Sequence, residues 1–190
     1  MSSIITELTT EAVRASRAHI LQGFTVFPSI YAVCDDGIHG LVGHDALDAL
    51  EAEDAVLSNW LAARGARAYV LLMEAWAPSV EAMDVAQIMP SLHSDREELL
   101  LAITVERGAN GKDTCTLVSC HVRRDPLTVS EPVFSSADER VLGPVSNLLP
   151  PRDAPTLSEH DKQVILAMVE RRSRYTLDAT VPRSPNATVH

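Results

Sequence analysis

Glu74 is the charged residue whose surroundings in the sequence most need an explanation. It lies in the run Ala68–Trp76 (AYVLLMEAW), where every other residue is hydrophobic. A carboxylate buried in such a run must be paired, hydrogen-bonded or shifted in pKa, because an unpaired buried charge is very costly. Glu74 is therefore either a general base or ligand, or one half of an ion pair with Arg96 or Arg67. We favour the ion pair, because structural pairs also perturb carboxyl groups.

Further polar residues lie just before the next strand-like run, in the sequence HSDRE at 93–97. If the protein is an enzyme, Glu74 is the expected base, and His93 and Asp95 are a proton-transfer pair or metal ligands. Arg96 would then clamp an anion, and Trp76 would form a wall of the ligand-binding site. A merely charged strand entrance is favoured over a metal site, because no second histidine follows at a ligand spacing such as H-x-x-x-H.

The three cysteines, Cys34, Cys115 and Cys120, predict free buried thiols in a reducing compartment, since they are odd in number and form no C-x-x-C pair. Cys115 and Cys120 should point to opposite faces of a strand, so they cannot share a metal without a bulge. His121 shares a face with Cys115, but the sequence offers no third group to orient such a pair.

The turn Asp35-Asp36-Gly37, with His39 and His44 nearby, is the other candidate for a metal loop. Asp-Gly is a strong turn signal, however, and a turn accounts for the first three residues fully. We therefore assign no metal site, and we expect no cofactor.

Composition and missing motifs narrow the function classes. The formal charge of −10 argues against binding to nucleic-acid backbones, and the acidic residues are too scattered to favour mimicry of nucleic acid. No apolar run approaches the length of a membrane span, and no signal peptide is apparent, so a cytoplasmic location is expected. The motifs of nucleotide-binding proteins, serine hydrolases and zinc peptidases are absent.

Periodicity and capping signals predict three helices. They cover residues 10–22, with Thr9 or Thr10 as cap and Gly23 as stop; residues 44–66, with Gly65 as stop; and a C-terminal helix opened by the capping box Thr156-Leu-Ser-Glu159 and carrying Val164, Ile165, Met168 and Val169.

Strand signals predict a hairpin from residues 24–34 into the residues after Gly37, and a central strand over 68–76. A second hairpin is expected from 98–106 to 114–123, with a short strand near 127–134. Pro28 would place the first strand at a sheet edge or a bulge. The connection 77–97 is long for a compact domain, so we expect it to hold a short helix or a functional flap.

These elements predict an α+β fold in a single domain, with a mixed or antiparallel sheet of four to six strands and two or three packed helices. The main alternative is a two-layer sandwich with the helices at one end. We place the globular domain at 1–150, a helix packed on it or on a partner at 151–172, and a flexible tail at 173–190.

Two functions remain open. The first is a non-catalytic interaction or assembly protein that acts as a homo-oligomer or docks to a larger complex, since catalytic motifs are missing and Met83, Ile88 and Met89 suit adaptable contacts. Its partner would be another protein or a second copy of the chain. The second is an enzyme or small-ligand-binding protein with its pocket between the central strand and the 77–97 connection.

Overall fold

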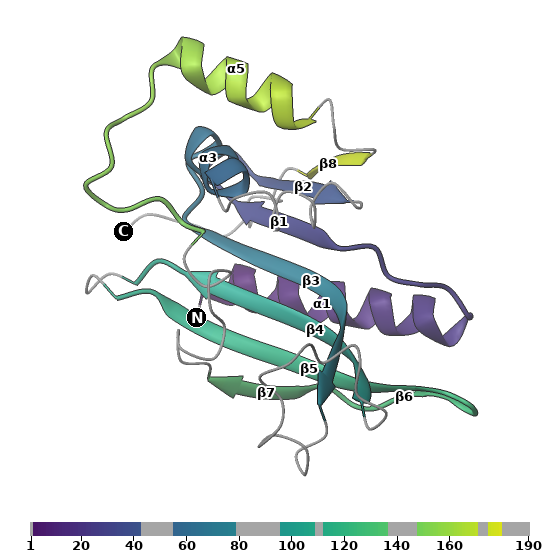
Figure 1. The fold of residues 1–190 in the computed structure, drawn as a ribbon. Coiled ribbons are helices and arrows are strands. Elements are labelled where there is room, and N and C mark those ends of the chain that lie inside the picture. The colour runs from purple at the N-terminus through teal and green to yellow at the C-terminus, as the bar shows by residue number, and fades with distance from the viewer. Residues whose placement is uncertain are drawn as a thin grey trace, which may run out of the picture.

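An open antiparallel sheet forms the centre of the molecule, with helices on both of its faces (Figure 1). The computed structural model describes residues 2–42, 55–78, 96–108, 112–136, 148–170 and 175–179. The helices are α1 (Ser3–Leu21), α3 (Ala55–Arg64) and α5 (Glu159–Glu170). The strands are β1 (Ser29–Val33), β2 (Ile38–Val42), β3 (Ala68–Pro78), β4 (Arg96–Glu106), β5 (Thr114–Arg124), β6 (Leu127–Val129), β7 (Val133–Ser136) and β8 (Tyr175–Ala179).

The sheet runs in the order β6-β5-β4-β3-β1-β2-β8, and β7 pairs with another part of β5. Every pairing is antiparallel. The predicted single-domain α+β fold is thereby confirmed. The described residues form eight strands and not four to six, because the segment expected to hold one short strand holds both β6 and β7, and β8 lies in the expected tail.

Each face of the sheet buries its own apolar core. Helix α1 covers one face, the α1 face, and contacts β3 and β4. Helices α3 and α5 contact each other and cover the other face, the α3 face, where Trp60 of α3 is completely buried. A strand in the middle of such a sheet is hydrophobic on both sides.

Helix α1 is held to the sheet by buried residues at intervals of three or four, namely Ile5, Thr9, Val13, Ser16 and Ile20. It begins seven residues before the predicted start at Thr10. The expected cap, Thr9, lies inside the helix: its hydroxyl donates to the Ile5 carbonyl at 2.7 Å and lies 3.0 Å from the Thr104 hydroxyl. Its polar group is therefore satisfied within the core.

Two glycines end helices as predicted. Gly23 and Gly65 have positive φ angles of 86° and 65°, a backbone region that costs glycine little. After α1, the N–H groups of Gly23 and Phe24 bond to the carbonyls of Ile20 and His19. The N–H groups that follow α3 make the same pair of bonds, which is the Schellman arrangement.

Pro28 does not place β1 at an edge. Strand β1 begins at Ser29 and lies between β2 and β3. Pro28 precedes the strand, so its missing N–H removes no bond from the ladder. The prediction was wrong because the strand is shorter than the apolar run that suggested it.

Strand β3 is central, as predicted, and it pairs with β1 and β4. Residues 68–72 are buried, whereas Met73, Glu74 and Ala75 are half-buried and Trp76 is 46% exposed. Figure 1 shows that β3 bends in its second half. Glu74 therefore lies between the buried first half of β3 and the exposed Trp76.

Helix α5 starts two residues later than the predicted capping box implies. Ser158 is the cap: its hydroxyl accepts the Asp161 N–H at 3.1 Å and donates to the Asp161 carboxylate at 2.6 Å. Leu166 and Val169 pack against the α3-face core, whereas Val164 and Met168 are 43% and 57% exposed.

Within the segment predicted to be a flexible tail, residues 175–179 form β8 and pair with β2. The described sheet therefore draws on residues beyond the predicted domain boundary at 150. The first part of the predicted 44–66 helix, the residues Met83, Ile88 and Met89, and the rest of the tail lie outside the described residues.

Candidate functional site

Glu74, Glu98 and Arg124 form a carboxylate cluster on the α1 face. Glu74 alternates along β3 with the buried Leu72, and Glu98 alternates along β4 with the buried Leu100. Arg124 ends β5 on the same face, two residues after Val122, which pairs with Glu98. Strand alternation and register therefore bring together three charged side chains from three strands.

Arg124 bridges the two carboxylates. Its Nε donates to both Glu98 oxygens at 3.0 Å, and its Nη2 donates to Glu98 Oε1 and to Glu74 Oε2, the latter at 2.9 Å. The other Glu74 oxygen accepts the N–H of Val26 at 2.7 Å. The two carboxylates thus accept hydrogen bonds from one guanidinium and one backbone amide.

Burial gives this cluster its electrostatic character. The side chains of Glu74 and Glu98 are 15% and 8% exposed, and that of Arg124 is 40% exposed. Burial raises the pKa of Glu74, and the neighbouring Glu98 raises it further, against the opposing effects of the Val26 N–H and Arg124. The hydrogen bonds to Glu98 raise the pKa of Arg124, which stays a cation.

Among the described side chains, Glu74 pairs with Arg124, a residue that the sequence-based expectation did not include. Arg124 takes this role, whereas Arg67 precedes β3 at its other end and lies 3.9 Å from Asp35. The backbone of Arg96 pairs with Pro78, four positions along the strand from the Leu100 that faces Glu74. The predicted buried ion pair exists, but its partner comes from β5, which the sequence did not indicate.

Of the other predicted site residues, Trp76 lies beside the cluster, because it pairs across the strands with Glu98. His93 and Asp95 lie outside the described residues, as does the side chain of Arg96. The proposed grouping of Glu74 with His93 therefore remains a prediction.

Four exposed apolar side chains lie on segments that lead to the carboxylate cluster or belong to it. Leu21, Phe24, Phe27 and Trp76, called here the apolar corner, are 46–53% exposed. They belong to the end of α1, the 22–28 connection and β3, and the Val26–Glu74 hydrogen bond joins the last two of these segments. Phe24 also stacks on His19 with ring centroids 4.8 Å apart.

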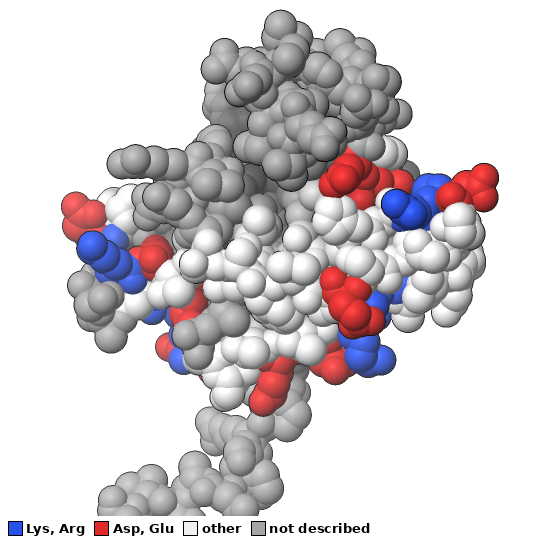
Figure 2. Space-filling model, turned by 90° about the horizontal axis from the view of Figure 1, so that it is seen from below, with Lys and Arg blue, Asp and Glu red and all other residues white. Residues whose placement is uncertain are grey.

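Two further exposed apolar residues, Val133 and Phe134, lie on the short strand β7. Figure 2 views the molecule from the side of β5 and β7. The described surface there has a central area without charged side chains, with acidic and basic groups interspersed on its flanks. The charges on this face form no block of a single sign.

On the α3 face of the same strands, His121 and Glu97 form a separate pair. Nδ1 of His121 lies 3.2 Å from Glu97 Oε2, and both side chains are about half exposed. Cys115, the thiol that the sequence places on the same strand face as His121, is buried in the α3-face core.

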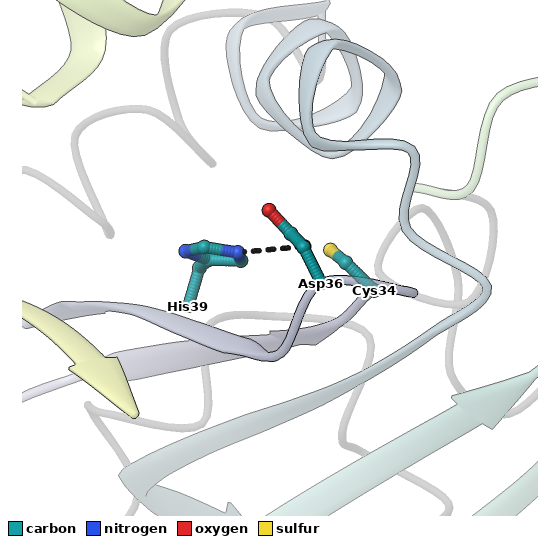
Figure 3. Close-up of side chains that lie close together, drawn as sticks. All are labelled: Cys34, Asp36 and His39. Atoms are coloured by element: carbon teal, nitrogen blue, oxygen red, sulfur yellow. Dashed lines mark hydrogen bonds and ion pairs between the residues drawn. The ribbon is translucent and has the colours of Figure 1, made fainter. Parts of the chain in front are cut away.

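A second cluster of reactive side chains lies in the β1–β2 hairpin and is called here the hairpin cluster. It consists of Cys34, Asp36 and His39, which face one another below α3 (Figure 3). The Cys34 N–H bonds to the Gly37 carbonyl at 2.8 Å and closes the turn. His39 Nε2 lies 3.0 Å from Asp36 Oδ1.

The members of the hairpin cluster differ in exposure. Cys34 and His39 are 3% and 8% exposed, whereas the side chain of Asp36 is 68% exposed. Burial raises the pKa of the Cys34 thiol to about 12, with a further contribution from Asp36. The hydrogen bond from His39 lowers the pKa of Asp36. The cluster thus pairs a neutral thiol with an ionised carboxylate.

The sequence could have indicated one of these clusters and not the other. C-x-D-x-x-H across the predicted turn Asp35-Asp36-Gly37 places three ligand types on adjoining strand ends, whereas the metal loop expected from the sequence did not include Cys34. Arg124 gave no such signal, since its partner Glu74 is 50 residues away and only the register of three strands relates them.

Comparison with known proteins gives no match: no family model, curated protein or solved structure is significantly similar to this chain. Within the described part of the chain, none of the helices combines the length and the apolar character that crossing a membrane requires.

Proposed function

We propose that this protein is a non-catalytic interaction protein that docks to another protein through the apolar corner. The observation that carries the proposal is the exposure of Leu21, Phe24, Phe27 and Trp76, three of them aromatic, on an acidic molecule. Aromatic residues are enriched in the cores of protein interfaces and supply much of their binding energy.

Charge selects the kind of partner. Beside the corner, two largely buried carboxylates share one guanidinium, and the whole chain has a formal charge of −10. A partner segment that carries a lysine or arginine between apolar residues would complement both features. Two copies of this chain would repel each other electrostatically, so we favour a different protein over a second copy.

A photo-crosslinking residue placed at Phe27 tests this docking. A matched control carries the same residue at Val164, which is also apolar and comparably exposed but lies on α5 over the other face of the sheet. In cells of the organism that encodes the protein, we expect position 27 to give a discrete crosslinked product with a different protein. The yield of this product should fall at higher salt concentration and in the variant Trp76→Ser. We expect no such product from position 164.

Equal products from both positions, or none from position 27, would contradict the proposal. A crosslinked product with twice the mass of the chain would identify self-association and would overturn the choice of a different partner. Light scattering of the purified protein over a range of concentrations gives the same distinction without crosslinking.

A second candidate function, binding of a small cationic ligand or catalysis on one, is favoured by the raised pKa of Glu74 beside an exposed Trp76. An aromatic face next to carboxylates binds ammonium groups well. A panel of amines and guanidines should then change the fluorescence of Trp76 in the wild type but not in Glu74→Gln. Identical responses of the two proteins would remove this candidate.

A further inference from the structure

The hairpin cluster brings together three different kinds of metal ligand. One thiol, one carboxylate and one imidazole from Cys34, Asp36 and His39 place a ligand atom each within 4.8 Å of the others. Figure 3 shows the three side chains rising from the same hairpin, with the carboxylate between the other two. This cluster shares no residue with the apolar corner, so its function is independent of the docking proposed above.

Local structure explains why the three side chains converge. Ala32 pairs with His39 across the hairpin, and Cys34 follows Ala32 by two residues, so both ligand side chains point toward the α3 face. Asp36 lies in the turn that the Cys34–Gly37 hydrogen bond closes. The grouping therefore follows from the hairpin register and needs no distant segment.

We propose that Cys34, Asp36 and His39 form a binding site for a zinc-type divalent cation. Zinc accepts sulfur, nitrogen and oxygen ligands at about 2.0–2.3 Å, which sets neighbouring ligand atoms about 3.5 Å apart in a tetrahedron. Asp36 and His39 are already close at 3.0 Å. All three ligand atoms lie within 4.8 Å of one another, which is only slightly wider than this spacing.

The ligand types select this class of metal. Magnesium and calcium prefer oxygen ligands, whereas a thiolate with an imidazole suits zinc and its neighbours among the transition metals. When the Sγ–metal bond forms, the thiol proton leaves to solvent, and no oxidation or reduction takes place. One thiolate and one carboxylate then neutralise the two charges of the ion, which lowers the free-energy cost of its partial burial below α3.

The exposure of Asp36 determines the remaining coordination. Among the described residues the cluster supplies three ligands, and Asp36 forms its solvent-facing side. Three protein ligands leave a fourth tetrahedral position for water.

Titration of the metal-free full chain with Co²⁺ tests the site, because cobalt bound to a thiolate and in a tetrahedral site gives characteristic absorption bands. The key variant is Asp36→Asn, and its matched control is Asp35→Asn, which removes the same charge from the neighbouring position of the same turn. We expect saturable binding of one Co²⁺ that Zn²⁺ displaces, a loss of affinity of about tenfold or more in Asp36→Asn, and wild-type affinity in Asp35→Asn.

The variant Cys34→Ser identifies the sulfur ligand and should abolish the thiolate-to-metal band, with circular dichroism checking that the chain still folds. If Cys34→Ser fails to fold, the comparison of the two aspartate variants still decides the question. An absence of thiolate bands in the wild type, equal effects of the two aspartate variants, or a band that persists in folded Cys34→Ser would each overturn the proposal.

Discussion

Replacing Arg124 by methionine removes the cation that bridges Glu74 and Glu98 while keeping most of the apolar stem. Breaking a fully buried ion pair costs about 3–5 kcal/mol, because the other charge is left unpaired. Here the Arg124 side chain is 40% exposed, so water replaces part of the lost interaction. We expect the free energy of unfolding to fall by about 2 kcal/mol at pH 7.

The matched control is Arg123→Met, which makes the same change one position earlier. Arg123 is exposed, and strand alternation directs its side chain to the opposite face of the sheet. Urea unfolding of both variants at pH 7 gives the comparison. An Arg124→Met value within about 0.5 kcal/mol of Arg123→Met, the usual range for a neutral surface substitution, would refute the structural importance of the bridge.

The pH dependence follows from the direction of the Glu74 pKa shift. A raised pKa in the folded state means that folding strengthens proton binding, so protonation of Glu74 stabilises the fold. The cost of keeping Glu74 ionised is present above its folded pKa and disappears as the pH falls toward its ordinary value of 4.5. The deficit of Arg124→Met should therefore shrink between pH 7 and pH 5, and adding Glu74→Gln should recover much of it at pH 7.

Two further changes test contacts described above. Ser158→Ala should lower the free energy of unfolding by about 1 kcal/mol, because it removes the cap of α5. Thr156→Ala, at the cap position that the sequence suggested, should have little effect. Equal melting temperatures for the two variants would contradict this assignment. Because Thr9 donates its proton to the Ile5 carbonyl, Thr104 must donate to Thr9. Thr9→Val should thus destabilise the fold by about 1–2 kcal/mol in urea unfolding, and Thr104→Val should cost clearly less, since only the first leaves a buried donor without an acceptor; the reverse order would exclude this hydrogen-bond direction.

Features that depend on neighbouring residues were predictable from the sequence. Gly23 and Gly65 end helices because the residue after the last turn adopts a positive φ angle. A glycine at the end of a helical pattern predicts such a position from the sequence alone. The burial and pairing of Glu74 followed from the hydrophobic run around it. The capping box was less certain, because two overlapping signals, at Thr156 and at Ser158, lie within three residues, and only the structure shows that Ser158 is used.

Features that depend on strand register were not predictable. The sequence places Arg124 near the end of a hairpin but does not say that β5 lies two strands from β3, so it could not identify Arg124 as the partner of Glu74. The edge position expected for Pro28 failed for a related reason, since strand length and neighbours are set by tertiary pairing. The sequence therefore indicated two residues of the candidate site, Glu74 and Trp76. It did not indicate the other two, Glu98 and Arg124.

Strand β8 has a consequence for how the chain folds as it is made. Residues 38–42 of β2 emerge early in synthesis, but the strand that covers their outer edge consists of residues 175–179. Until those residues are available, the outer backbone groups of β2 can pair with the same strand of another nascent chain. Because β8 is synthesised last, the edge of β2 stays open to pairing with other chains during most of synthesis. Pairing of β8 with β2 then closes this edge and prevents such association.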